Sequence, residues 1–429
     1  WGVADRLLSV EDSRRGETRY SYTPTGQLER AEYPDGREQW RKSDQTGNLY
    51  PDPDMRLRRY LGGGRLEQDG EWHCEYDADG NLTERYLGTG RWLDGKKDRW
   101  RYRWNADGSL AKVVRPDKRE VEFTYDALGR RLSKSFGTTV TRWVWNGNVP
   151  LHQWKRRREY SVMGNRWRTD TERCDMTVWL FDEESFVPVA MIKEGRSYSI
   201  LTDQLGTPTE AYDAEGNEVW SRVLDMDGNV IEETGNKGMV PFLFQGQYYD
   251  RETGLAYNRF RYYSPKMGMY VSQDPIGLAG GILNLYGYVD DTLSFIDILG
   301  LIKFRRNMSE REVQSTLENG GLVRGINGSR GAKWISTMDN SYRDVNGLEV
   351  VLDMNDDVVN SIIKPRVLDY ENMIGGESKN MDKVLVKSNE PGAMGIGVGI
   401  LENFNQYIKS ITVYKIVKGK RKQIHYQQK

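Results

Sequence analysis

Apolar and polar residues alternate over short stretches of the first 300 residues, which predicts β-strands with one buried face. Trp100, Tyr102 and Trp104 alternate with arginines, and Val121 and Phe123 alternate with glutamates. Successive side chains of a strand point to opposite faces of a sheet, so this spacing places the apolar ones together. No stretch approaches ~18 consecutive apolar residues, which excludes a membrane-spanning helix.

A repeated unit predicts a series of β-hairpins. It consists of an aromatic residue, a polar triplet, a glycine, one or two polar residues and an aliphatic residue. The glycine supplies the positive φ that a tight turn needs, and the flanking aromatic and aliphatic residues face the same side. Many hairpins in series form a long sheet, which must curl or close to protect its edges. The units span residues 22–28, 76–82, 104–110, 125–132 and 212–219.

Composition supports a β structure and places a boundary near residue 301. The 429 residues include 13 Trp, 25 Tyr and 45 Gly, too many aromatics for a disordered chain. Two cysteines cannot form a disulfide framework, and three histidines leave little for a His-rich metal site. Twelve Trp and 20 Tyr lie at or before residue 301, whereas residues 302–429 carry a net charge of +5. We therefore expect a separate domain after residue 301.

Residues 242–301 carry a dense motif, which begins Phe242-Leu-Phe-Gln-Gly-Gln-Tyr-Tyr-Asp250-Arg-Glu-Thr-Gly254-Leu-Ala-Tyr257-Asn-Arg-Phe-Arg261-Tyr-Tyr-Ser-Pro265 and continues through Gly268-Met-Tyr-Val-Ser272-Gln-Asp274-Pro-Ile-Gly-Leu278. This motif resembles the Rhs repeat-associated core. The repeats resemble the YD repeats of the Rhs family and of the C components of insecticidal toxin complexes. The resemblance covers roughly residues 15–301. It implies a hollow β-cocoon shell, a core that closes one end as a plug, and a C-terminal toxin held inside. The expected fold is mostly β, with a shell fragment over 1–241, the core over 242–301 and a toxin domain over 302–429.

The same resemblance implies the partners. A toxin of this family is secreted, with a contractile, type VI-like system as the expected route, and acts on a macromolecule in the cytoplasm of the recipient cell. It requires delivery components and a cognate immunity protein that protects the producer. Because the sequence begins inside the repeats, we expect it to be a fragment of a longer protein.

The family cleaves itself at the end of the core, after a proline, four residues and Asp-Pro-x-Gly-Leu. The matching stretch runs from Thr292 to Leu301, with Thr292 and Ile298 where the family has proline. The cut would fall between Leu301 and Ile302, at the composition boundary. By resemblance, Asp274 and Asp297 are the protease pair, because two neighbouring carboxylates can act as base and acid. The alternative interpretation is that both aspartates only form turns.

Residues 302–429 predict a small α+β domain. Ser309 and Glu312 have the spacing of a capping box, which predicts a helix to about residue 318. Strands are expected over 322–326, 332–337 and 348–352, with a last strand over 411–417. The glycine-dense stretch 392–404 is interpreted as a turn.

This order resembles the Arg–Ser–Glu branch of the bacterial ADP-ribosyltransferase toxins, which use NAD as a substrate and no metal. By resemblance, Arg324 binds NAD, Ser336 and Thr337 shape the nicotinamide pocket, and Glu402 is the catalytic carboxylate. A guanidinium can donate two hydrogen bonds to phosphate or ribose oxygens, and a carboxylate can stabilise the cation formed as nicotinamide leaves. Many relatives carry Glu or Gln where this chain has Ile400, and Glu349 and Glu390 are the alternative carboxylates.

Two other functions remain open for the tail. A nuclease toxin would use its basic end, residues 415–425, to contact phosphates. Its single histidine, His425, is a poor start for a nuclease base, and Asp353, Asp356 and Asp357 are more simply interpreted as a solvated turn. The third possibility is an inert tail behind a structural shell.

Overall fold

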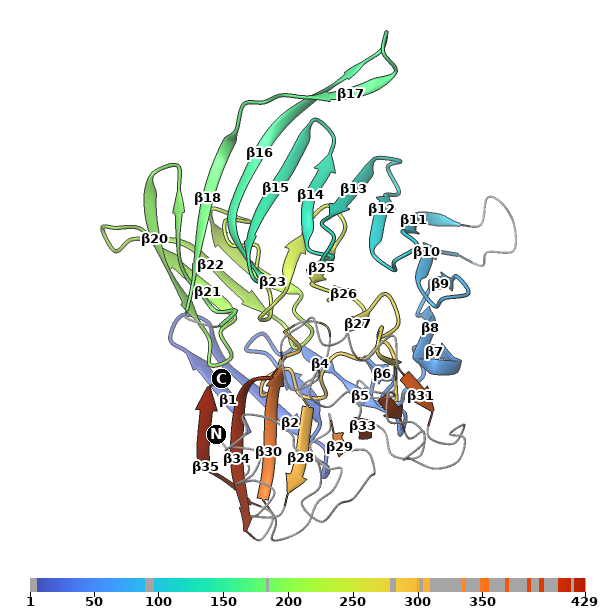
Figure 1. Ribbon diagram of the computed structural model, residues 1–429, viewed down its shortest axis with the longest axis vertical. Coiled ribbons are helices and arrows are strands. Elements are labelled where there is room, and N and C mark those ends of the chain that lie inside the picture. Colours follow the sequence, from blue (N-terminus) through green and yellow to red (C-terminus); the bar gives the residue numbers. More distant parts are fainter. Residues whose placement is uncertain are drawn as a thin grey trace. The chain divides into compact units, whose positions relative to one another are not determined.

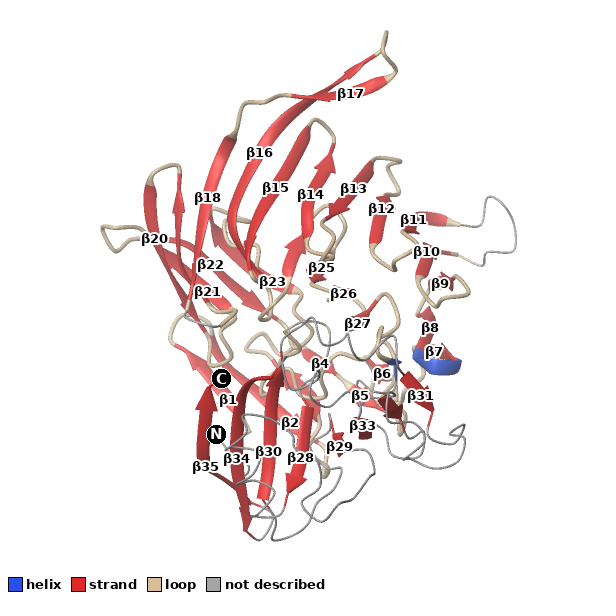
Figure 2. Ribbon diagram, viewed as in Figure 1, coloured by secondary structure: helices blue, strands red, loops and turns tan. Residues whose placement is uncertain are grey.

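The computed structural model describes residues 6–88, 96–182, 185–277, 283–298 and 300, together with the backbone of eight strands between residues 304 and 428. The chain divides into two units. The first unit comprises residues 1–273 and 286–300, and the second comprises 274–285 and 301–429. The described structure is almost entirely β (Figure 2), and its only helical element is the short 3₁₀ turn η1, Gly62–Gly64.

A long antiparallel meander forms the wall of the first unit. Each strand pairs with the next in chain order, except that β16 pairs with both β17 and β18. Figure 1 shows β12 to β16 side by side. The wall strands are β7 (Arg58–Leu61), β8 (Arg65–Asp69), β9 (Trp72–Tyr76), β10 (Leu82–Leu87), β11 (Lys97–Trp104), β12 (Leu110–Val114), β13 (Glu120–Tyr125), β14 (Arg131–Phe136), β15 (Thr139–Asn146), β16 (Val149–Ser161), β17 (Arg166–Thr169), β18 (Cys174–Phe181), β19 (Pro188–Lys193), β20 (Arg196–Thr202), β21 (Pro208–Tyr212), β22 (Glu218–Leu224) and β23 (Val230–Gly235).

Two smaller sheets precede the wall. The first has four antiparallel strands in chain order, and the second is a two-stranded pair. Buried Leu28 and Ala31 pack with Met226, which belongs to the loop between β22 and β23. This contact joins the N-terminal sheet to the wall. The strands are β1 (Ser9–Asp12), β2 (Gly16–Tyr22), β3 (Leu28–Glu32), β4 (Glu38–Trp40), β5 (Lys42–Ser43) and β6 (Leu49–Tyr50).

The repeated sequence unit forms hairpins, as predicted. Each of the five units connects two paired strands, for example β9 to β10 and β11 to β12. In the first of these turns the amide of Gly80 donates to the carbonyl of Asp77 at 3.1 Å, with φ of 77° at the glycine. The Asp77 carboxylate then accepts from the Asn81 amide at 2.8 Å and closes the turn. The aliphatic residue that ends the unit is buried in three of the five units, as Leu28, Leu82 and Leu110, whereas Leu132 is exposed and Val219 is half-buried.

The first unit contains a further four-stranded antiparallel sheet, which we call the plug sheet after the role expected for it. It contains β24 (Tyr248–Asp250), β25 (Leu255–Asn258), β26 (Arg261–Ser264) and β27 (Met269–Tyr270). Every residue of β25, β26 and β27 is buried. Both faces of this sheet are therefore covered, which explains the near-continuous apolar and aromatic sequence. Its core cluster consists of Leu243, Phe244, Ala256, Tyr263, Tyr270 and Tyr288.

The second unit contains an eight-stranded sheet in the order β31-β32-β33-β29-β28-β30-β34-β35. All its pairs are antiparallel except β31 with β32. The predicted strands 332–337, 348–352 and 411–417 are confirmed as β29, β30 and β34. The strands are β28 (Phe304–Met308), β29 (Lys333–Ser336), β30 (Leu348–Met354), β31 (Val367–Asp369), β32 (Val384–Val386), β33 (Ala393–Ile396), β34 (Ile408–Val417) and β35 (Lys420–Gln428).

Two expectations for the second unit are wrong. β34 is not the last strand, because β35 follows it and pairs with it. The glycine-dense stretch 392–404 is not wholly a turn, because Ala393–Ile396 forms β33 between β29 and β32. Pairing on both sides outweighs the low strand propensity of glycine there. The predicted helix 309–318 and strand 322–326 lie outside the described residues.

Candidate functional site

The predicted site residues differ in how far the structure describes them. Asp297 and Asp274 are described with their side chains. Ser336 is placed by its backbone at the end of β29, where it pairs with Arg305 of β28 and with Ala393 of β33. Four predicted residues lie outside the described residues, namely Leu301, Arg324, Thr337 and Glu402.

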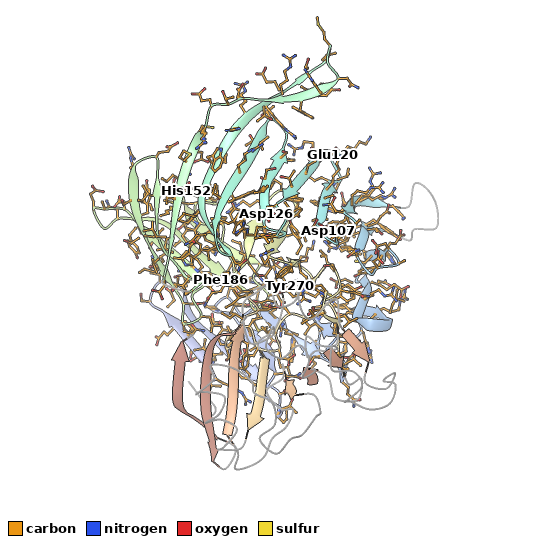
Figure 3. All side chains as sticks on the ribbon, viewed as in Figure 1. Asp107, Glu120, Asp126, His152, Phe186 and Tyr270 are labelled. Atoms are coloured by element: carbon orange, nitrogen blue, oxygen red, sulfur yellow. The ribbon has the colours of Figure 1, made fainter. Side chains whose placement is uncertain are left out.

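Asp297 is a buried carboxylate held by two side chains of the plug sheet. Its Oδ2 accepts a hydrogen bond from Tyr270 Oη at 2.9 Å and from Arg261 Nη2 at 3.1 Å. All three side chains are almost completely buried. Figure 3 shows Tyr270 amid densely packed side chains. The Arg261 guanidinium and the Tyr270 hydroxyl thus help to compensate the buried charge of this carboxylate.

Side chains of the plug sheet also hold the backbone around Asp297 by hydrogen bonds. Asn258 Nδ2 donates to the Asp297 carbonyl at 2.8 Å, and Arg261 Nε donates to the Gly300 carbonyl at 2.9 Å. Between them, the Ile298 carbonyl lies against Gly246, where an added Cβ would stand 2.0 Å from its oxygen. Gly246 therefore makes room for the chain that leads to the predicted cut. We call residues 297, 298 and 300 of this chain the exit segment.

Burial and the nearby charge of Asp297 keep the hydroxyl groups of Tyr270 and Tyr288 protonated. Burial, and next the charge of Asp297, raise the pKa of Tyr270 well above its usual value. Burial likewise raises the pKa of Tyr288, whose Oη accepts a hydrogen bond from the Asp297 amide at 3.4 Å. Both hydroxyls therefore keep their protons at neutral pH. The Arg261 guanidinium lies 3.6 Å from the centre of the Tyr270 ring, a cation–π contact that fixes both groups.

Asp274 has a different environment, in the second unit. Its Oδ1 accepts from the Ile276 amide at 2.9 Å, and its own amide donates to the Leu285 carbonyl at 2.8 Å. The first bond is an Asx turn, which agrees with the turn-forming interpretation of this residue. Its side chain is nevertheless 9% exposed, so a carboxylate is largely withdrawn from water. The pairing of Asp274 with Asp297 stays a prediction.

Thr292, which stands at a family proline position, has a structural role of its own. Its hydroxyl donates to the Met226 carbonyl at 2.7 Å, and the residue is 2% exposed. A proline could not make this bond, because its side chain has no donor. The hydroxyl therefore ties the start of the predicted cleavage motif to the loop between β22 and β23.

Sequence reasoning missed the residues that hold Asp297. Asn258, Arg261 and Tyr270 all lie in the core stretch quoted above, but nothing in their spacing indicates a shared partner at residue 297. A second buried group was also missed: Arg131 and Lys134 of β14 surround Asp250 of β24. In the described part of the chain no group of three or more His, Cys, Asp or Glu side chains has the arrangement of a metal site.

Comparison with known proteins identifies the family. The Teneurin YD-shell family matches residues 4–284, and the chain belongs to this family. This confirms the Rhs and YD-repeat resemblance of the shell. None of the described helices is long and apolar enough to cross a membrane.

Three relatives are toxins or enzymes by name. Double-stranded DNA deaminase toxin A of Burkholderia cenocepacia (strain H111) is 33% identical over 325 residues, 70% of this chain and 22% of the relative. Probable deoxyribonuclease RhsA of Dickeya dadantii (strain 3937) is 30% identical over 246 residues, 56% of this chain and 16% of the relative. Toxin protein Tse5 of Pseudomonas aeruginosa (strain PAO1) is 34% identical over 268 residues, 56% of this chain and 19% of the relative. The chain thus spans less than a quarter of each of these relatives.

Proposed function

We propose that the first unit is part of a shell that encloses a toxin, residues 302–429, and that the chain cuts itself between Leu301 and Ile302. The observation that carries this proposal is the buried carboxylate of Asp297, at the start of the exit segment. Tyr270 and Arg261 of the plug sheet donate hydrogen bonds to it. The hydrogen bond from Arg261 Nε to the Gly300 carbonyl also supports the proposal, because this bond fixes the backbone next to the proposed cleavage site.

The cut is a hydrolysis, with water as the second reactant. The oxygen of water bonds to the carbonyl carbon of Leu301, and the bond from that carbon to the nitrogen of Ile302 breaks. One carboxylate of the Asp274–Asp297 pair takes a proton from the water, and the other gives a proton to the departing nitrogen. The products are a new carboxyl end at Leu301 and a new amino end at Ile302.

The cut is tested by expressing the chain and its Asp297→Asn and Asp274→Asn variants. We expect two fragments from the wild-type chain, with masses that place the cut after Leu301, and one uncut band from each variant. Asp291→Asn is the matched control, because Asp291 is equally buried but bonds the Leu293 amide. Normal cutting of Asp297→Asn would remove this residue from the mechanism.

For the cargo we propose an ADP-ribosyltransferase with NAD as its substrate. The support is the ordered set of Arg324, Ser336 with Thr337, and Glu402, together with the place of Ser336 on a strand. In the reaction the glycosidic bond of NAD breaks, nicotinamide leaves, and a nucleophile of the target bonds to the ribose carbon and loses a proton. Glu402 would stabilise the ribose cation. The target would be a macromolecule of the recipient cell, with a component of the translation machinery as one candidate, and the producer would need an immunity protein.

A nuclease cargo is the second candidate, supported by the basic hairpin at the end of the chain. In the β34–β35 pair, Lys415 lies opposite Lys422 and Val417 lies opposite Lys420. Paired residues of antiparallel strands share one face, so the Lys415 and Lys422 positions concentrate positive charge. The names of the deaminase and deoxyribonuclease relatives favour nucleic acid as the target of such a cargo.

One experiment separates the two cargo proposals. The purified chain is incubated with labelled NAD and a bacterial lysate, in parallel with Glu402→Gln. Label transferred to protein or RNA by the wild-type chain only supports ADP-ribosylation by Glu402. Degradation of DNA or RNA without NAD supports the nuclease, and transfer by Glu402→Gln at the normal rate rejects the assignment of Glu402.

A further inference from the structure

We propose that Tyr270 and Asn258 are positioning residues for the self-cleavage, which together orient both the carboxylate and the carbonyl of Asp297. This inference rests on the proposed cut between Leu301 and Ile302. Neither side chain carries a charge, and both act through Asp297 rather than on the reacting bond.

The hydrogen bonds around Tyr270 have one consistent direction. Asn258 Nδ2 lies 2.7 Å from Tyr270 Oη, and Tyr270 Oη lies 2.9 Å from Asp297 Oδ2. An amide nitrogen can only donate, so the hydroxyl accepts from Asn258 and directs its single proton to the carboxylate. The carboxylate oxygen is thereby held in one place relative to the plug sheet.

Asn258 uses the same nitrogen for the backbone. Its Nδ2 also donates to the Asp297 carbonyl at 2.8 Å, and a carbonyl can only accept. This partner fixes which end of the side-chain amide is nitrogen. The opposite end, Oδ1, is buried with no hydrogen-bond partner among the described residues. Among the described residues, Asn258 therefore acts on Asp297 through its Nδ2 donor.

The two residues thus control different parts of the same aspartate. Tyr270 sets the direction of the carboxylate, and Asn258 sets the backbone that leads through the exit segment to the proposed bond. Both are 0% exposed, so water does not compete for these hydrogen bonds. A displacement of about 1 Å at a reacting group can cost on the order of 100-fold in rate, so such fixed contacts matter for the cut.

The test compares Tyr270→Phe with Tyr263→Phe. Both rings belong to the same core cluster and meet edge to face at 5.8 Å, but Tyr263 Oη donates to the Asp227 carbonyl. Each variant loses one buried hydroxyl and keeps its ring. We expect Tyr270→Phe to slow the cut by about 10- to 100-fold, whereas Tyr263→Phe cuts at the wild-type rate.

The cut is followed by pulse labelling in cell-free synthesis, with samples on denaturing gels at pH 5.5 to 8.5. Tyr270→Phe should also change the pH dependence of the rate, which a loss of stability alone would not do. Asn258→Leu, similar in size but without a donor, is a second variant and should slow the cut as well. Cutting by Tyr270→Phe or Asn258→Leu with the wild-type rate and pH profile overturns the inference and leaves the self-cleavage intact. A wild-type chain that stays uncut would contradict both the proposed self-cleavage and this inference.

Discussion

The guanidinium of Arg131 on wall strand β14 binds the carboxylate of Asp250 on plug strand β24, with both side chains withdrawn from water. Arg131 Nη2 lies 3.2 Å from Asp250 Oδ1, and the side chains are 1% and 0% exposed. Lys134 Nζ donates to the same oxygen at 2.9 Å. Arg131 also lies over the rings of Trp143 and Tyr257, at 4.6 and 4.7 Å from their centres. One carboxylate thus joins the plug to the wall.

Replacing Asp250 with Asn should destabilise the first unit strongly. The substitution leaves the buried charges of Arg131 and Lys134 without this partner, and breaking a buried ion pair costs about 3–5 kcal/mol. The free energy of unfolding is measured by urea denaturation monitored by tryptophan fluorescence. Asp117→Asn is the control, because Asp117 forms an ion pair with Arg119 at the surface and should change the curve little. Equal losses for the two variants would contradict the anchoring role of Asp250.

Replacing Gly246 with Ala should disturb the exit segment. Gly246 has φ of 83°, and its new Cβ would lie 2.0 Å from the Ile298 carbonyl oxygen. Gly216 has φ of 85° with nothing near its Cβ position, so Gly216→Ala carries the same backbone strain without the collision. We expect Gly246→Ala to lose about 1–3 kcal/mol more in free energy of unfolding than Gly216→Ala. Indistinguishable denaturation midpoints would show that the exit segment does not pack on Gly246.

Stability should depend on pH through Asp225. Burial, and next the charge of Asp227, raise the pKa of Asp225 to about 7 from an ordinary value of 3.8. The folded state then binds more protons than the unfolded state between these two values. The contribution of Asp225 is therefore complete below about pH 3.8 and is lost as the pH rises through 7.

The comparison with Asp225→Asn isolates this effect. Between pH 4 and 7 the free energy of unfolding of the wild type should fall relative to that of the variant, and above pH 8 their difference should be constant. Urea denaturation at four pH values in this range measures the difference. A difference that is flat across the window would show that Asp225 titrates at its ordinary pKa.

The two cysteines should differ sharply in reactivity. Cys74 is buried, and desolvation raises the pKa of its thiol to about 12, whereas Cys174 is exposed. The thiolate is the reactive form, so a maleimide should label one thiol in the native protein and the second only after unfolding. Mass spectrometry gives the count, and Cys174→Ser should remove the native labelling. Rapid double labelling of the native chain would contradict the burial of Cys74.

Local signals made the shell predictable. A turn such as Asp77 to Asn81 is built by residues next to one another, so a repeated unit in the sequence becomes a repeated hairpin. The surroundings of Asp297 depend instead on contacts with Asn258 and Tyr270, which are 39 and 27 residues away. Only the folded plug brings these residues together. Strand β33 was not predicted for a similar reason, because the glycines of residues 392–404 favour a turn locally, while two neighbouring strands pair with β33.

The contacts that hold residues 297, 298 and 300 have a consequence for a chain that has been cut. The contacts described for this stretch come from the core itself, through Asn258, Arg261, Tyr270 and Gly246. None of them depends on the peptide link that follows. If the chain is cut after Leu301 as proposed, residues 302–429 become a separate molecule while residues 297, 298 and 300 keep their contacts with the core. The cut would then leave the fold of the first unit unchanged, so any release of the tail from that unit would be a second step.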